Sequence, residues 1–143
     1  LQSPVIFGSA KPVPVNYANL KSPKRDMALV ALAGPGSNFL LAIACSLPLR
    51  FGVFGFETPG GAFLLQAVIL NVVLGVFNLI PFPPLDGSKV LAGLLSEKYL
   101  PVLFSLERYG FVLIIVLLFS GIFGLVLLPV LNIFLKLFVG VTL

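Results

Sequence analysis

Long apolar stretches separated by short charged segments constrain the fold of this chain more than any other feature. Residues 27–49, 62–80 and 109–128 carry no charged side chain. About 20 consecutive apolar residues suffice to cross the hydrocarbon core of a bilayer. Hydrophobic residues make up 59% of the chain and charged residues only 10%, whereas soluble domains are roughly a quarter charged. The sequence predicts an all-α integral membrane protein, a bundle of three to four transmembrane helices in contact with the lipid bilayer.

The two ends of the chain differ from these apolar stretches. Residues 1–26 are predicted to form a short extended segment, because valine alternates with proline at 11–16 and proline disfavours helix. Pro129 is predicted to end the third helix. Residues 130–143 are too short to cross unaided, and they are expected to form a fourth helix that is interfacial, re-entrant or closely packed. At 143 residues, the chain is expected to form one membrane-embedded unit.

The positive charges predict an orientation. With three crossings, residues 1–26 and 81–108 lie on one side of the membrane and residues 50–61 on the other. Seven basic residues fall on the first side and only Arg50 on the second; the seven are Lys11, Lys21, Lys24, Arg25, Lys89, Lys98 and Arg108. The positive-inside rule therefore places the first side in the cytoplasm of a multi-pass cell-membrane protein. These basic residues flank apolar segments and are not interleaved with aromatics, so no nucleic-acid partner is expected, and the sequence specifies no oligomeric state.

Asp86 stands out among only five acidic residues, because it follows an apolar stretch and a run of three prolines. Ionisable groups at membrane depth are costly and commonly functional. One interpretation is a helix N-cap, in which the carboxylate accepts free backbone N–H groups, and spacing alone favours it slightly. The other is a metal ligand held by a stiff proline turn, with Gly87 allowing a close backbone approach. The two interpretations are compatible.

A second cluster lies inside the first apolar stretch, at residues 34–38. Small residues such as Gly34 usually serve close helix packing. Asn38 differs, because an amide inside the bilayer needs a partner. It is expected either to bond a neighbouring helix or to steady a substrate carbonyl or oxyanion. Together with Asn71 and Asn78, it predicts a polar interior between the helices.

Several segments, in this order, resemble the site-2 protease family of intramembrane zinc metallopeptidases. They are Phe7–Asn16, Arg25–Met27, Ala33–Pro35, Asn78–Gly87 and Glu107–Gly110. The resemblance covers nearly the whole chain. It implies a polytopic helical core that cuts peptide bonds within or beside the membrane, with transmembrane protein segments as substrates.

The resemblance also implies residue roles. Asp86 corresponds to the third zinc ligand. Asn38 corresponds to a catalytic residue that binds substrate or stabilises the oxyanion, and Gly34 and Asn78 fall in substrate-binding motifs. The other two ligands and the general base of the family come from a His-Glu-x-x-His helix. This chain contains no histidine.

The missing histidines lead to an expectation about the chain itself. It is expected to be the C-terminal part of such a protease, lacking the His-Glu-x-x-His helix and inactive alone. Two alternatives remain open. One is a catalytically inactive homologue that binds membrane-protein substrates, and the other is a structural or transport component of a membrane.

Overall fold

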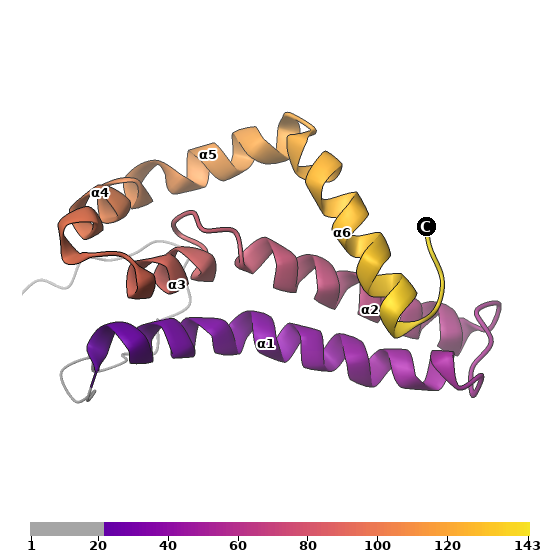
Figure 1. Ribbon diagram of the computed structural model, residues 1–143. Coiled ribbons are helices and arrows are strands. Elements are labelled where there is room, and N and C mark those ends of the chain that lie inside the picture. Colours follow the sequence, from indigo (N-terminus) through magenta and orange to yellow (C-terminus); the bar gives the residue numbers. More distant parts are fainter. Residues whose placement is uncertain (1–21) are drawn as a thin grey trace, which may run out of the picture.

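The computed structural model describes residues 22–143 of the protein (Figure 1). This part of the chain folds into α-helices and one short 3-10 helix, with no strand among the described residues. In chain order the elements are α1 (Pro23–Arg50), α2 (Pro59–Asn78), α3 (Asp86–Leu94), η2 (Glu97–Tyr99), α4 (Leu100–Ser105), α5 (Glu107–Phe119) and α6 (Ile122–Phe138).

Helix α1 contains the first predicted apolar stretch, and α2 contains all but the last two residues of the second; both helices begin slightly ahead of these stretches. Each has a proline in its first turn, Pro23 in α1 and Pro59 in α2, where the missing N–H group costs nothing. The Thr58 hydroxyl caps α2 by accepting a hydrogen bond of 3.0 Å from the Gly61 N–H. Because α1 already begins at Pro23, the expectation of an extended segment over 1–26 is wrong for residues 23–26. Residues 1–21 lie outside the described part.

The expected single helix over 109–128 is wrong, because the chain breaks at Ser120 and Gly121. Helix α5 ends at Phe119, and Gly121 adopts φ +76°, a left-handed conformation that ends a helix and that other residues rarely adopt. The Ser120 hydroxyl then accepts a hydrogen bond of 3.3 Å from the N–H of Ile122, the first residue of α6. The apolar stretch 109–128 therefore includes a turn between two helices and is not one helix.

Pro129 does not end a helix, contrary to expectation, but lies inside α6. The fourth helix therefore begins at Ile122, ahead of the expected 130, and ends at Phe138, with a non-helical tail at 139–143. Proline removes one intrahelical hydrogen bond. Transmembrane helices tolerate this loss because local adjustments and neighbouring groups satisfy the freed carbonyl.

Helix α1, with 28 residues, packs against α2, α3 and α6. Figure 1 shows α2 and α3 lying one after the other along it, with α4, α5 and α6 forming a bent cover on the other side of α2 and α3. The buried apolar core joins α1, α2 and α6; its members are Ala42, Leu49, Val68, Val72, Leu131, Leu135 and Val139. Phe39 of α1 stacks on Phe134 of α6 with ring centroids 5.1 Å apart.

The bundle has two distinct ends. We call the end formed by the start of α1, by α3 and by α4 the Asp86 end, and the end formed by the α1–α2 loop the loop end. The Arg50 guanidinium at the end of α1 donates hydrogen bonds to the carbonyl oxygens of Leu137 and Phe138, the last residues of α6. Helix α5 starts at the Asp86 end, so α5 and α6 together run the length of the bundle as one broken path (Figure 1).

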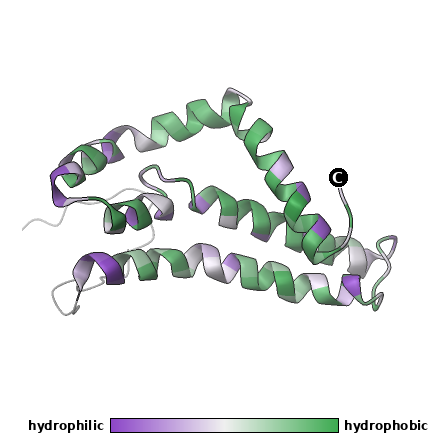
Figure 2. Cartoon of the chain, in the orientation of Figure 1, coloured by the Kyte–Doolittle hydropathy of each residue, from purple (hydrophilic) through white to green (hydrophobic). Residues whose placement is uncertain are grey.

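Large apolar side chains cover the outside of the bundle. Phe119 is 88% exposed and Phe111 is 69% exposed, and apolar colouring follows α1, α2, α5 and α6 in Figure 2. Helices α1 and α2 are each long and apolar enough to cross a membrane. A third crossing is added if the segment Glu97–Ser105 and α5, which meet at a bend of 59°, count as one span. The chain is an all-α membrane protein.

Candidate metal-ligand site

Asp86 follows a stiff turn between α2 and α3. Helix α2 ends at Asn78 and the turn contains Pro81, Pro83 and Pro84, with the Pro83–Pro84 peptide bond cis. The Leu85 N–H closes the turn with a bond of 3.0 Å to the Phe82 carbonyl oxygen. Three prolines leave this turn few backbone conformations. The helix break expected between Asn78 and Asp86 is confirmed.

The expected N-cap role of Asp86 is wrong. Leu85 occupies the N-cap position, Asp86 is the first residue of α3, and no side chain caps this helix. The carboxylate makes no capping hydrogen bond to the N–H groups of its own helix. Its position in the first turn still suits an acidic group, because the helix dipole favours negative charge there.

The Asp86 carboxylate lies between Lys89 of its own helix and Gly34 of α1. Oδ1 is 3.2 Å from the Lys89 Nζ. A Cβ added to Gly34 would lie 2.9 Å from Oδ2, closer than side chains normally pack. The Asp86 side chain is 31% exposed. The sequence interpretation paired neither residue with Asp86, although the three-residue spacing to Lys89 on a helix was a usable signal.

Two glycines hold the backbone on either side of Asp86. A Cβ at Gly87 would meet the carbonyl oxygens of Leu79 and Ile80, as the expected close approach requires. A Cβ at Gly110 of α5 would meet the Pro83 carbonyl oxygen. The turn is therefore fixed from two sides, by α3 and by α5, and the Glu107–Gly110 motif has a structural role as a support of this turn.

The packing of α3 on α1 sets the depth of Asp86. Helix α3 runs antiparallel to α1: the Lys24 ammonium donates a bond of 3.0 Å to the Leu95 carbonyl oxygen, and Gly93 lies against Ala28. Further along, Asp86 contacts Gly34, seven residues beyond the first residue of the apolar stretch at 27. At 1.5 Å per residue, the carboxylate lies about 10 Å inside the apolar part of α1.

Among the described residues, no hydrogen bond joins one asparagine side chain to another, and the polar interior stays a prediction. The Asn71 amide donates a bond of 2.8 Å to the Ala67 carbonyl oxygen of its own helix. Asn38 is half-buried one turn after Gly34, so it lies on a similar side of α1. Asn78 is half-buried at the end of α2. No hydrogen bond among the described residues involves the side chain of Asn38 or Asn78, and the buried core beside them is apolar.

A zinc ion needs more than this chain provides around Asp86. Within residues 22–143, no three histidine, cysteine, aspartate or glutamate side chains lie close enough together to hold a metal ion. A catalytic zinc site normally has three protein ligands. The Asp86 carboxylate could serve as one ligand of such a site, because it is an oxygen donor held close to α1 within the apolar span. The described residues do not supply the other ligands.

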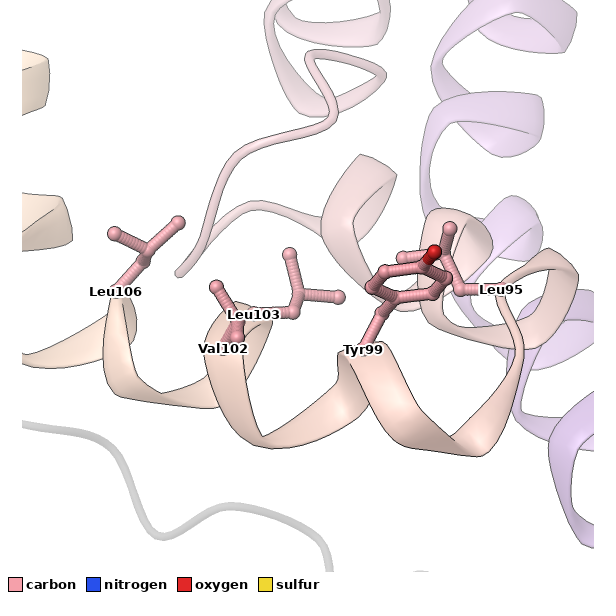
Figure 3. A pocket seen from close by; sticks show the side chains of 5 residues that line it. All are labelled: Leu95, Tyr99, Val102, Leu103 and Leu106. Carbon is pink, nitrogen blue, oxygen red and sulfur yellow. The ribbon is translucent and has the colours of Figure 1, made fainter.

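An apolar pocket of about 240 Å³ lies near the Asp86 end (Figure 3). It is lined by Leu95, Tyr99, Val102, Leu103 and Leu106. The Tyr99 hydroxyl is the single polar group among the side chains drawn there. Among the described residues, its lining contains no carboxylate, cysteine or histidine.

Comparison with known proteins finds one matching family model and several relatives. Residues 55–121 match the family model described as "Peptidase family M50". The chain is 37% identical over 133 residues to YwhC of Bacillus subtilis (strain 168), whose name describes it as a candidate zinc metalloprotease. It is also 37% identical over 79 residues to the zinc metalloprotease MJ0392 of Methanocaldococcus jannaschii. The chain is therefore similar to members of peptidase family M50, the site-2 protease family, as its motifs indicate.

These relatives are longer than the matched segments. The first match covers 88% of this chain and 61% of YwhC, and the second covers 55% of this chain and 23% of MJ0392. A third relative, Rip2 of Mycolicibacterium smegmatis, is 32% identical over 101 residues, which are 67% of this chain and 37% of that protein. No solved structure matches the chain.

Proposed function

We propose that this chain supplies the aspartate ligand of an intramembrane zinc metalloprotease of the site-2 type. Asp86 would be the third ligand, and the substrates would be peptide bonds in or near transmembrane segments of other proteins. One observation carries the proposal: the Asp86 carboxylate lies about 10 Å inside the apolar span, held against α1 by a proline turn. A carboxylate at this depth is energetically costly, and such residues usually mark a functional site.

The remaining ligands would come from outside these 143 residues. The chain has no histidine, so the other two zinc ligands and a general base would belong to a further segment of polypeptide or to a partner. We therefore expect this chain alone to be inactive. When bound, zinc would polarise the scissile carbonyl and lower the pKa of water at the site.

Asn38 is the residue best placed to assist the reaction from α1. Its amide is half-buried one turn from the Gly34–Asp86 contact, inside the apolar span. An amide N–H group there could donate to a substrate carbonyl and stabilise its developing negative charge. Asn78, at the break that ends α2, is the second candidate for holding substrate backbone.

The proposed location follows from the charge distribution. The Asp86 end carries most of the basic residues, so we expect it to face the cytoplasm of the cell membrane. Transmembrane protein substrates would reach the site from the bilayer, and their helices would have to unwind there before cleavage.

The test uses the native protein purified from its own membranes. Its activity is followed as the appearance of cleaved transmembrane proteins when it is incubated with vesicles of those membranes. Removal of metal with a chelator should abolish cleavage and added zinc should restore it. Asp86→Ala should abolish it irreversibly, whereas removal of the exposed acid in Glu97→Ala should not. Cleavage that persists in Asp86→Ala would refute the proposal.

A further inference from the structure

We infer that Gly34 is a positioning residue for Asp86. Its missing side chain sets how closely the carboxylate approaches α1, and thereby where the carboxylate presents its oxygens. This role differs from the substrate-binding role that the family motif implies for Gly34. The part of the inference that concerns the metal rests on the proposed function.

The contact is specific to the carboxylate. A Cβ on Gly34 would lie 2.9 Å from the Asp86 Oδ2 and 3.9 Å from its Cγ. Among the described residues, and apart from its chain neighbours and the nearby backbone of α1, the added atom would meet no other group within 4 Å. Carbon and oxygen atoms without a hydrogen bond do not pack at 2.9 Å. An added methyl must therefore displace this carboxylate, and it disturbs little else.

A methyl group on Gly34 would move the Asp86 carboxylate and not the backbone of α3, because neighbouring segments pack tightly against that backbone and its turn. Gly87 lies against the Leu79 and Ile80 carbonyl groups, and Gly110 lies against Pro83. The Gly87 contact keeps α3 close to the turn, and the Gly110 contact leaves the turn no room to move toward α5. A methyl on Gly34 would thus be accommodated by rotation of the Asp86 side chain.

Lys89 restrains the carboxylate less than Gly34 does. Its ammonium is 3.2 Å from Oδ1, but the Lys89 side chain is 47% exposed. Exposed ion pairs contribute little and long lysine side chains move easily. The steric contact with Gly34 is therefore the firmer of the two restraints on the side chain.

Gly36 provides a matched control on the same helix. It lies two residues after Gly34, on the other side of Pro35, and a Cβ added there meets nothing from residues 22–143 within 4 Å outside its own turn of α1. Gly34→Ala and Gly36→Ala add the same methyl to the same turn of α1. A difference between them reports the contact with Asp86 and not the helix propensity of alanine.

The first test measures the contact itself, in the native protein purified in mild detergent. Thermal unfolding is compared for Gly34→Ala, Asp86→Ala and the double variant. Gly34→Ala should lower the midpoint by about 3–6 °C in the wild-type background. In the Asp86→Ala background it should lower the midpoint little or not at all, because the clashing carboxylate is gone. Gly36→Ala should show no dependence on residue 86. An equal cost of Gly34→Ala in both backgrounds would overturn the inference.

The second test separates positioning from a merely structural role. Zinc affinity is measured by competition with a chromophoric chelator, and the geometry of the site by the visible spectrum of the cobalt-substituted protein. Gly34→Ala should weaken zinc binding by about 10-fold or more and shift the cobalt spectrum, whereas Gly36→Ala should match wild type. Unchanged affinity and spectrum in Gly34→Ala would overturn the positioning role. If the wild-type protein binds no zinc, the proposed function fails, and the unfolding comparison still decides whether Gly34 sets the position of Asp86.

Discussion

A single methyl group is enough to disturb the setting of Asp86, because glycines contact it and its turn at three places. Gly34 faces the carboxylate, Gly87 faces the end of α2, and Gly110 faces Pro83. The contacts of Gly34 and Gly110 join residues far apart in the chain, so sequence spacing could not reveal them, whereas the close approach at Gly87 was expected. The interpretation of Asp86 as an N-cap was wrong because Leu85 takes that position; the Asp86 carboxylate pairs with Lys89 and lies against Gly34.

At residue scale, Gly110→Ala should destabilise the fold by about 1–3 kcal/mol, because its methyl would meet the backbone of Pro83, which cannot move aside. Gly124→Ala is the control, since a Cβ there meets nothing within 4 Å in the described part of the chain, outside its own turn of α6. The control should be neutral or slightly stabilising, as alanine favours helix. The measurement is the midpoint of thermal unfolding followed by circular dichroism in detergent. Equal midpoints for the two variants would contradict the packing of α5 on the turn.

At the scale of whole elements, hydropathy predicts α1 and α2 well and the third span poorly. A run of apolar residues without charge indicates burial in lipid, but it does not distinguish a straight helix from two helices joined at a turn. The signal that was available, Ser120 followed by Gly121, is short and local. Pro129 led to the opposite error, the prediction of a helix end where the helix continues, because a proline in a transmembrane helix can remain inside it.

The break between α5 and α6 can be tested at Gly121. Gly121→Ala should destabilise the protein by about 1 kcal/mol, because alanine is strained at φ +76°. Gly121→Asn should cost less, since asparagine tolerates left-handed backbone. The two variants are compared by thermal unfolding. A more stable Gly121→Ala variant would indicate that α5 and α6 form one continuous helix.

The start of α2 gives a second test at this scale. Thr58→Ala removes the hydroxyl that accepts from the Gly61 N–H at 3.0 Å, so it should lower the free energy of unfolding by about 1 kcal/mol. Thr58→Ser retains the hydroxyl and should stay close to wild type. Chemical unfolding in mixed detergent measures both values, and indistinguishable curves for Ala and Ser would contradict the cap.

At the scale of the whole molecule, the structure changes the charge count that predicts orientation. The hydrogen bonds from Arg50 to the end of α6 bring Lys136 to the loop end. The comparison becomes seven basic residues against two, because Lys136 joins Arg50. The predicted orientation is unchanged, and the end of α6 is now expected on the side of the α1–α2 loop.

Cysteine labelling tests this topology in intact cells. Single cysteines replace the exposed residues Glu57 and Lys98 in a Cys45→Ala background, since Cys45 is the chain's single native cysteine. A membrane-impermeant maleimide should label Glu57→Cys from outside and should label Lys98→Cys only after the membrane is opened. The reverse pattern would contradict the cytoplasmic position of the Asp86 end.

The central claim, that Asp86 binds zinc, is tested most directly by the zinc content of the native protein purified from its membranes. Elemental analysis should find one zinc per chain in wild type and in Glu97→Ala, which removes an acid whose side chain is 87% exposed. Asp86→Ala should lose most of that zinc, because the site would be left with one protein ligand too few. An unchanged zinc content in Asp86→Ala would contradict the account.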